Sequence, residues 1–224
     1  MSELKNNAGG IDLSVVIPLY NERENIRPLF NKIKEAVTPI EADWEVIFVD
    51  DGSTDGSDRE LAELMDPSGR VRIITLRRNF GKSAALSAGF QEVRGRQIVL
   101  MDADLQDDPG EIPGLLEKLD AGFDLVSGWR VDRRDRFIKK YTSRIFNLVT
   151  SMLSGIKLHD FNCGLKAMDG EVAETISLYG ELHRYIPVLA FWKGFRVTEK
   201  KVRHHPRAAG ESKFGVYRFF AGFM

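Results

Sequence analysis

Apolar positions along the first 130 residues follow two alternating periods. Short, nearly continuous apolar runs of strand length lie at 13–19, 44–49, 71–76, 97–101 and 123–127. Between the first two runs, residues 22–37 carry apolar side chains at helical spacing, and shorter helical patterns separate the later runs. Strands that alternate with helices predict an α/β fold, Rossmann-like, with a mostly parallel sheet and helices on both faces.

Polar clusters directly follow three of the predicted strands. They are Pro18-Leu19-Tyr20-Asn21-Glu22, Asp50-Asp51-Gly52-Ser53 and Asp102-Ala103-Asp104-Leu105-Gln106. The carboxyl ends of parallel strands meet at one edge of a sheet, and ligands of such sheets bind outside that edge. Chance placement of an acidic turn explains any one cluster, but three clusters at the same edge favour a binding site.

Two aspartates one residue apart end the fourth apolar run. In an extended chain, residues two apart point to the same side, so Asp102 and Asp104 are expected to converge. Two carboxylates held together repel each other unless a cation or hydrogen-bond donors lie between them. A hard divalent ion shared with substrate phosphates suits this arrangement, whereas the alternative is a solvated acidic turn.

The composition is that of an ordinary globular protein, with 43% hydrophobic and 29% charged residues among 224. We therefore assign one domain over residues 1–224, with a polar tail at 1–10. The formal net charge of −1 provides no overall field that would attract nucleic acid. The single cysteine, Cys163, excludes an internal disulfide framework and a cysteine-rich metal site.

The C-terminal end of the chain is rich in aromatic residues. Residues 214–224 end without a helix stop or a polar tail, and no run of about 18 apolar residues precedes them. We expect them to begin an interfacial helix, and we expect the natural protein to continue into a C-terminal membrane part.

A dense cationic segment opens the second half of the chain. Seven Lys and Arg residues lie between Arg130 and Arg144, and apolar residues interleave with them at helical spacing over 137–152. The pattern predicts an amphipathic helix with a basic flank. The helix either packs its apolar stripe on the core or lies on an anionic membrane surface, where each Lys or Arg contributes about 1 kcal/mol. The residues themselves leave both interpretations open.

Several motifs together resemble those of one enzyme family. They are Val15-Val16-Ile17-Pro18-Leu19-Tyr20-Asn21-Glu22, Val49-Asp50-Asp51-Gly52-Ser53-Thr54-Asp55, Asn79-Phe80-Gly81-Lys82, Asp102-Ala103-Asp104-Leu105-Gln106, Asp160-Phe161-Asn162-Cys163-Gly164 and residues 207–215. The set resembles family 2 glycosyltransferases with the GT-A fold. Within that family it is similar to polyprenyl-phosphate sugar transferases, such as dolichyl-phosphate mannose synthase and the bactoprenol glucosyltransferases. The resemblance covers nearly the whole chain.

The resemblance implies a nucleotide-sugar site made from three groups of residues. The base pocket would be formed by Pro18, Tyr20, Glu22, Val49 and Asp51. Ribose and diphosphate would lie on Asp102, Ala103 and Asp104. Mg²⁺ or Mn²⁺ would bind Asp104 and Gln106, because a glutamine carbonyl is an acceptable neutral oxygen ligand.

The resemblance also implies an acceptor site and a lid. Arg130 and Arg144 would bind the phosphate of a polyprenyl phosphate, since guanidinium groups match phosphate oxygens bidentately. Residues 207–215 are polar and contain glycines, so they form either a plain connector or a lid in which Arg207 and Lys213 close on the donor diphosphate. Asp160 is the usual candidate for a base in such enzymes, and we favour an orienting role for it.

The function implied is transfer of a hexose, from a donor of the UDP-glucose or GDP-mannose type, to a polyprenyl phosphate at the cytoplasmic face of a membrane. The reaction would be metal-dependent and inverting, with Asp104, Arg130, Arg144 and Asp160 as the catalytic residues. The expected partners are the nucleotide sugar, the lipid phosphate and an anionic membrane surface.

Two alternatives stay open, namely a non-catalytic nucleotide-sugar-binding domain at a membrane and a family 2 transferase with a glycan acceptor. A P-loop at Gly81-Lys82-Ser83 is set aside, because the glycine required five residues earlier is Leu76. A nucleotidyltransferase is set aside as well, because it needs a glycine-rich basic loop after the first strand.

Overall fold

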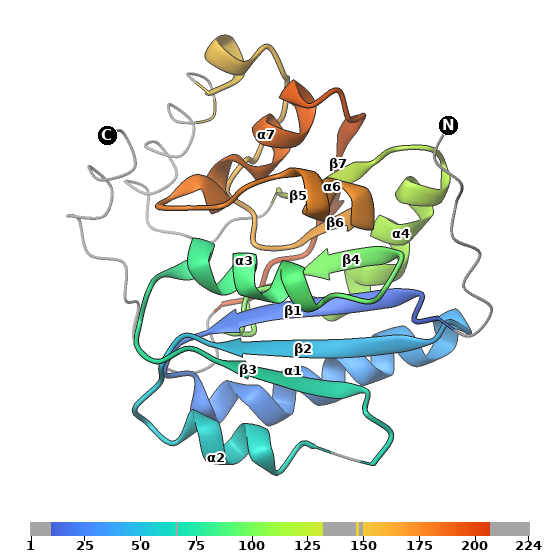
Figure 1. Cartoon of the computed structure of the whole chain (residues 1–224). Helices are drawn as coiled ribbons and strands as arrows, with labels where there is room; N and C mark the ends of the chain where they lie inside the picture. Colours follow the sequence, from blue (N-terminus) through green and yellow to red (C-terminus); the bar gives the residue numbers. More distant parts are fainter. Residues whose placement is uncertain (1–9, 66, 132–146, 148–149, 207–224) are drawn as a thin grey trace.

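The computed structural model describes residues 10–65, 67–131, 147 and 150–206 (Figure 1). Its described part contains one seven-stranded sheet with the order β3-β2-β1-β4-β6-β5-β7. The strands are β1 (Leu13–Leu19), β2 (Trp44–Asp50), β3 (Val71–Thr75), β4 (Gln97–Leu100), β5 (Leu125–Arg130), β6 (Lys166–Asp169) and β7 (Val197–Val202). β6 runs antiparallel to its neighbours β4 and β5, and the other strands run in one direction. The prediction of an α/β fold with a mostly parallel sheet is therefore confirmed.

Helices separate the strands as the apolar periods predicted. The α-helices are α1 (Arg23–Val37), α2 (Ser57–Ala62), α3 (Lys82–Glu92), α4 (Ile112–Asp120), α6 (Gly170–Thr175) and α7 (Ile186–Trp192). The short 3₁₀ helices are η1 (Thr38–Ile40), η2 (Pro109–Glu111) and η3 (Leu182–Tyr185). Each predicted helix of the first half agrees with an observed one to within a few residues. The agreement arises because the apolar stripe that predicts each helix is the face that packs against the core.

Helices cover both faces of the sheet (Figure 1). On one face, alternate β1 residues such as Val15 and Ile17 pack with apolar residues of α1 and α4, including Ile26 and Leu115. On the other face, Val16 belongs to a second apolar cluster that includes residues of α3, α6 and α7. Because successive strand residues are buried on opposite faces, β1 and β2 read as continuous apolar runs rather than alternating ones.

The antiparallel strand β6 was not predicted. It has four residues, Lys-Ala-Met-Asp, and Lys166 is buried at its first position. The Lys166 ammonium donates a hydrogen bond to the carbonyl of Cys163, and burial lowers the pKa of this lysine. A short strand that opens with a charged residue has no strand signature in the sequence, because its stability comes from pairing with β4 and β5.

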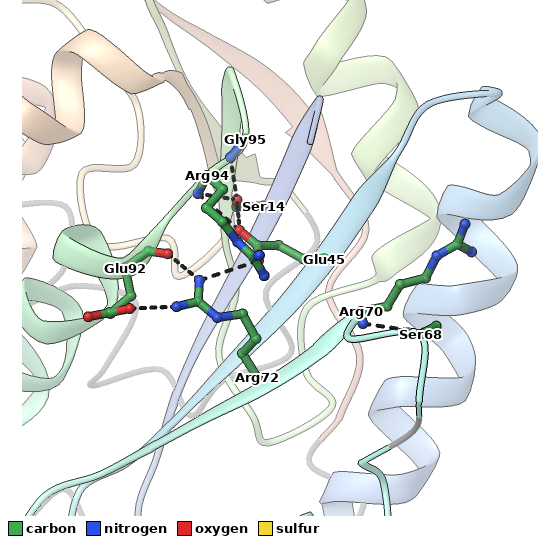
Figure 2. Close-up of polar contacts among 8 residues, drawn as sticks. All are labelled: Ser14, Glu45, Ser68, Arg70, Arg72, Glu92, Arg94 and Gly95. Carbon is green, nitrogen blue, oxygen red and sulfur yellow. Dashed lines mark hydrogen bonds and ion pairs between the residues drawn. The ribbon is translucent and has the colours of Figure 1, made fainter. Parts of the chain in front are cut away.

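A buried carboxylate links three elements at the amino end of the sheet (Figure 2). Glu45 of β2 is fully buried and accepts hydrogen bonds from the hydroxyl of Ser14, at 2.7 Å, and from the guanidinium and backbone N–H of Arg94. Arg72 of β3 bridges Glu45 and Glu92 at the end of α3. This network lies at the end of the sheet opposite to the predicted site.

Several predicted features fall outside the described residues. They are the tail at 1–10 except its last residue, most of the basic helix at 137–152, the loop at 207–215 and the segment 214–224. Residues 150–154, at the end of the predicted basic helix, are helical. In the part of the chain that the structure describes, no helix has both the length and the apolar character needed to cross a membrane.

Candidate functional site

The parallel strands deliver their carboxyl ends to one edge of the sheet, and antiparallel β6 begins at that same edge. In the register of the sheet, Leu100 at the end of β4 pairs with Lys166 at the start of β6. The loops that follow β1, β2, β4 and β5 therefore share this edge with residues 160–165, which lead into β6. The predicted gathering of polar clusters is confirmed.

The loops after β1 and β2 are joined by hydrogen bonds. Asn21 has a left-handed backbone, with φ of 53°, and its N–H donates to Ser53 Oγ at 2.8 Å. The N–H of Thr54 donates back to Asn21 Oδ1 at 2.7 Å, and the N–H of Glu22 donates to Ser57 Oγ. These reciprocal bonds make the two loops one rigid unit at the edge.

The side chains predicted for a base pocket lie around this unit. Pro18 pairs in register with Val49, and Tyr20 and Glu22 are half-buried at the end of β1. The side chain of Val49 is completely buried beneath Gly89 of α3.

Asp51 connects the β2 loop to the start of α3. Its two carboxylate oxygens accept hydrogen bonds from the N–H groups of Phe80 and Gly81, at 2.7 and 2.8 Å. The adjacent Gly52 has φ of +72°, and a Cβ there would lie 2.6 Å from the backbone of Arg78. Only glycine fits this close approach. Asp51 is thus a structural anchor for the turn that positions the first residues of α3.

The first two residues of α3 reach across the edge of the sheet. Lys82 forms an ion pair with Asp102, and the two side chains are 30% and 38% exposed. Burial pushes the pKa of Asp102 up, but the charge of Lys82 and its hydrogen bond outweigh burial and lower the pKa. Ser83 Oγ lies 3.0 Å from His183 Nδ1 and accepts a hydrogen bond from the backbone N–H of His183. Burial and the charge of Lys82 lower the pKa of His183 to about 3.

The expected convergence of Asp102 and Asp104 assumed an extended chain. The structure corrects this assumption, because β4 ends at Leu100 and residues 103–104 form a turn. Leu105 has φ of 61°, an uncommon conformation that a bulky residue adopts only when its surroundings impose it. The N–H of Gln106 donates to Asp104 Oδ1 at 3.2 Å, so these two predicted metal ligands lie in one tight turn.

Asp107 is a buried carboxylate at the same edge. It is 4% exposed, and among the described residues no donor lies within hydrogen-bonding distance of its Oδ2. Burial, and then the charge of Asp102, raises the pKa of Asp107 to about 7. A methyl group placed on Gly164 would lie 2.6 Å from Asp102 Oδ2 and 2.7 Å from Asp107 Oδ2. Both carboxylates therefore face the bare Cα of this glycine.

Arg130 and Asp160 meet beside this group in a bidentate ion pair. Arg130 Nε lies 2.7 Å from Asp160 Oδ2, and Nη2 lies 3.0 Å from Oδ1. Asp160 Oδ1 also accepts the N–H of Asn162 at 3.1 Å. Cys163 is buried, and burial raises the pKa of its thiol to about 12, as is typical of an unreactive core cysteine.

The last described residues lie against the acidic turn. His204 forms an antiparallel bridge with Asp107, and the N–H of His205 donates to the carbonyl of Gln106 at 2.7 Å. His205 Nε2 also lies 3.2 Å from Asp108 Oδ2. The predicted site residues Arg144, Arg207 and Lys213 are outside the described residues.

A divalent cation fits the oxygen ligands at this edge. Within the described residues, no three His, Cys, Asp or Glu side chains converge on one point. Mg²⁺ and Mn²⁺ nevertheless commonly bind one or two carboxylates together with substrate phosphates. The unpartnered Oδ2 of Asp107, facing Asp102 across Gly164, is the kind of orphaned buried oxygen that a cation satisfies.

Sequence reasoning missed three residues of this edge. Lys82 belonged to a recognised motif but received no role, and neither Asp107 nor His183 carried a signal that separates it from surface charge. Asp107 is next to Asp108 and reads as part of a solvated acidic run. In the structure its side chain is buried and its backbone pairs with His204, a contact between distant segments that no local pattern reveals.

Comparisons with known proteins identify the family of this chain. The family described as "Glycosyl transferase family 2" matches residues 14–177. The chain is 39% identical over 215 residues to the Dodecaprenyl-phosphate galacturonate synthase of Rhizobium johnstonii, covering 94% of this chain and 64% of that protein. It is 38% identical over 211 residues to the Undecaprenyl-phosphate 4-deoxy-4-formamido-L-arabinose transferase of Salmonella choleraesuis, covering 92% and 63%. The chain thus spans less than two thirds of the length of these relatives.

A solved structure supports the fold. The glucosyl-3-phosphoglycerate synthase of Mycobacterium tuberculosis, in complex with Mn²⁺, uridine diphosphate and glucosyl-3-phosphoglycerate, superposes with a TM-score of 0.67. The match covers 88% of this chain and 73% of that chain, with 20% sequence identity. Likeness at this level of identity concerns the α/β architecture alone.

Proposed function

This chain belongs to glycosyl transferase family 2, and from that premise we propose that it transfers a sugar from a nucleotide-diphosphate donor to a polyprenyl phosphate. The observation that carries the proposal is that Asp51, Asp102, Asp107 and the Arg130–Asp160 pair all lie at the carboxyl edge of the sheet. Ligands of α/β sheets bind outside this edge. Two relatives, 39% and 38% identical to this chain, are named for a polyprenyl phosphate, dodecaprenyl phosphate in one and undecaprenyl phosphate in the other.

The donor half of the site is the rigid unit after β1 and β2. The nucleoside would lie against Pro18, Tyr20 and Glu22, above the buried Val49 and the anchoring carboxylate of Asp51. The diphosphate would extend towards Asp102, Ala103 and Asp104. The Lys82 ammonium, held beside Asp102, places a positive charge at the diphosphate end.

Mg²⁺ or Mn²⁺ would be held by Asp104 and Gln106. When bound, the ion would neutralise charge that develops on the leaving diphosphate. Arg207 and Lys213 would add positive charge from the segment that follows His205, whose N–H bonds to Gln106 at 2.7 Å.

The acceptor half is centred on Arg130. Asp160 holds two of the five N–H groups of the guanidinium and so fixes its orientation, while Arg144 would provide a second guanidinium. A phosphate oxygen of the lipid would attack the anomeric carbon as the bond to the diphosphate oxygen breaks, giving inversion and a free nucleoside diphosphate. The acceptor phosphate is already anionic, so Asp160 acts as an orienting carboxylate rather than as a base.

The identity of the transferred sugar is to be determined by a screen of donors. The sequence favoured a hexose donor such as UDP-glucose or GDP-mannose, whereas the relatives' names contain galacturonate and 4-deoxy-4-formamido-L-arabinose. We place the reaction at the cytoplasmic face of a membrane, where the lipid acceptor would be presented and the basic segment from Arg130 to Arg144 would meet anionic lipids.

The test measures release of nucleoside diphosphate from a panel of UDP-sugars and GDP-mannose, with Mn²⁺ and a short polyprenyl phosphate. Release that requires both the lipid phosphate and the metal supports the proposal. Equal release with a glycan acceptor would overturn the lipid assignment, and no release from any donor would favour a non-catalytic binding domain. Asp104→Ala should abolish transfer; a wild-type rate in saturating Mn²⁺ would contradict the metal dependence.

A further inference from the structure

We propose that Asp107 is a ligand of the divalent cation and holds it together with Asp102, an inference that rests on the function proposed above. The family-derived prediction placed the ion on Asp104 and Gln106 alone. The structure adds a buried carboxylate that faces the same edge and that no sequence signal singled out.

Two carboxylate oxygens, one from Asp102 and one from Asp107, face the Cα of Gly164. A methyl group on Gly164 would lie 2.6 Å from Asp102 Oδ2 and 2.7 Å from Asp107 Oδ2. Any side chain at this position would separate the two carboxylates, and the glycine leaves them facing each other across a bare Cα. Oxygen ligands presented in this way suit a hard divalent cation.

The nearby cations of the protein have partners other than Asp107. Lys82 pairs with Oδ1 of Asp102, the guanidinium of Arg130 is held by Asp160, and the ammonium of Lys166 donates to the carbonyl of Cys163. In the described part of the chain, Asp107 Oδ2 has no hydrogen-bond donor, and the side chain is 4% exposed. A buried carboxylate with an unpartnered oxygen beside a second carboxylate is unfavourable until a cation or donor arrives.

The backbone fixes the position of Asp107 before any ligand binds. The bridge to His204 holds it from one side, and the hydrogen bond from His205 N–H to Gln106 O holds the residue before it. The N–H of Gln106 closes the turn by donating to the carboxylate of Asp104. The side chains of Asp104 and Gln106 therefore belong to the turn that immediately precedes Asp107. A preorganised ligand set loses little conformational freedom when it binds an ion.

The test measures Mn²⁺ binding to the 224-residue chain without donor or acceptor, by electron paramagnetic resonance of free Mn²⁺ and by calorimetry. Asp107→Asn keeps the shape of the side chain and removes its charge, and we expect Mn²⁺ affinity to fall tenfold or more. Asp108→Asn is the matched control, because its carboxylate pairs instead with Arg203 and His205. Its Mn²⁺ affinity should stay within about twofold of wild type.

Thermal unfolding without metal separates ligation from damage to the fold. Asp107→Asn should melt at or above the wild-type temperature, because it removes a buried charge next to Asp102. Mn²⁺ should then raise its melting temperature less than it raises that of wild type. Gly164→Ala, which fills the space between the two carboxylates, should also weaken Mn²⁺ binding.

The outcomes distinguish this inference from the proposed function. Equal Mn²⁺ affinity of wild type and Asp107→Asn overturns the role of Asp107 and leaves metal-dependent transfer standing. A wild-type chain that binds no Mn²⁺ without donor overturns the role of Asp107, whereas the metal dependence of transfer is decided separately by the release assay. Weakened binding in Asp107→Asn and Gly164→Ala, with unchanged binding in Asp108→Asn, supports the assignment.

Discussion

Arg130 and Asp160 form a buried bidentate ion pair between the end of β5 and the loop that leads into β6. Their side chains are 9% and 4% exposed, and the Nε–Oδ2 distance is 2.7 Å. The pair joins a strand end to a loop thirty residues further along the chain. It also orients the guanidinium that we assign to the acceptor phosphate, so fold and function depend on the same contact.

Asp160→Ala should destabilise the protein by roughly 3–5 kcal/mol, because it leaves a buried guanidinium without a counter-charge. Urea unfolding measures this loss. Glu63→Ala is the matched control, since the Arg27–Glu63 pair is 46% and 68% exposed and is expected to contribute about 0–1 kcal/mol. Losses of the same size in both variants would show that the buried pair has no special role.

Asp51→Ala should loosen the turn before α3, because the N–H groups of Phe80 and Gly81 lose their acceptor. We expect a stability loss of about 3 kcal/mol, since hydrogen bonds to a charged group contribute about 1.5–3 kcal/mol each and water replaces part of them. The KM for the donor should rise, because Lys82 follows this turn. A raised KM with unchanged stability would instead mean that the carboxylate acts directly on the nucleoside.

Glu45→Ala should destabilise the protein by roughly 3–5 kcal/mol while the KM for the donor stays unchanged. The fully buried Glu45 binds Arg94 and Ser14 at the amino end of the sheet, away from the site (Figure 2). Urea unfolding and steady-state kinetics at low temperature separate the two effects. Glu45→Gln keeps an acceptor for Ser14 and should lose less stability. A changed KM in the alanine variant would contradict a purely structural role.

His183 should make the folded state less stable as the pH falls below about 6.5. The pKa of His183 is near 6.5 in the unfolded chain but about 3 in the folded protein, because burial and Lys82 disfavour the charged form. Between these values the unfolded chain binds more protons, so stability rises with pH across this window. His183→Gln should reduce the difference in unfolding free energy between pH 7 and pH 5. An unchanged difference would show that other groups dominate this range.

The strands that carry the site could be predicted because their signal is local. Buried parallel strands need continuous apolar runs, and β1 and β2 were located to within one residue of their observed bounds. The polar clusters after β1, β2 and β4 were also placed at the correct edge, since all parallel strands end on the same side. Arg130 and Asp160 were both selected as site residues, although nothing in the sequence indicated that they bind each other.

The sequence by itself thus determined the α/β architecture and the edge of the sheet at which the polar clusters gather. The tertiary structure alone decided the antiparallel insertion of β6, the turn that ends extended geometry after Leu100, and the approach of Asp107 and Asp102 to Gly164. The physical reason is the distance along the chain between the residues that determine each feature. Periodicity reports which residues are buried within one element, whereas these features depend on strand order and on contacts between segments distant in the chain.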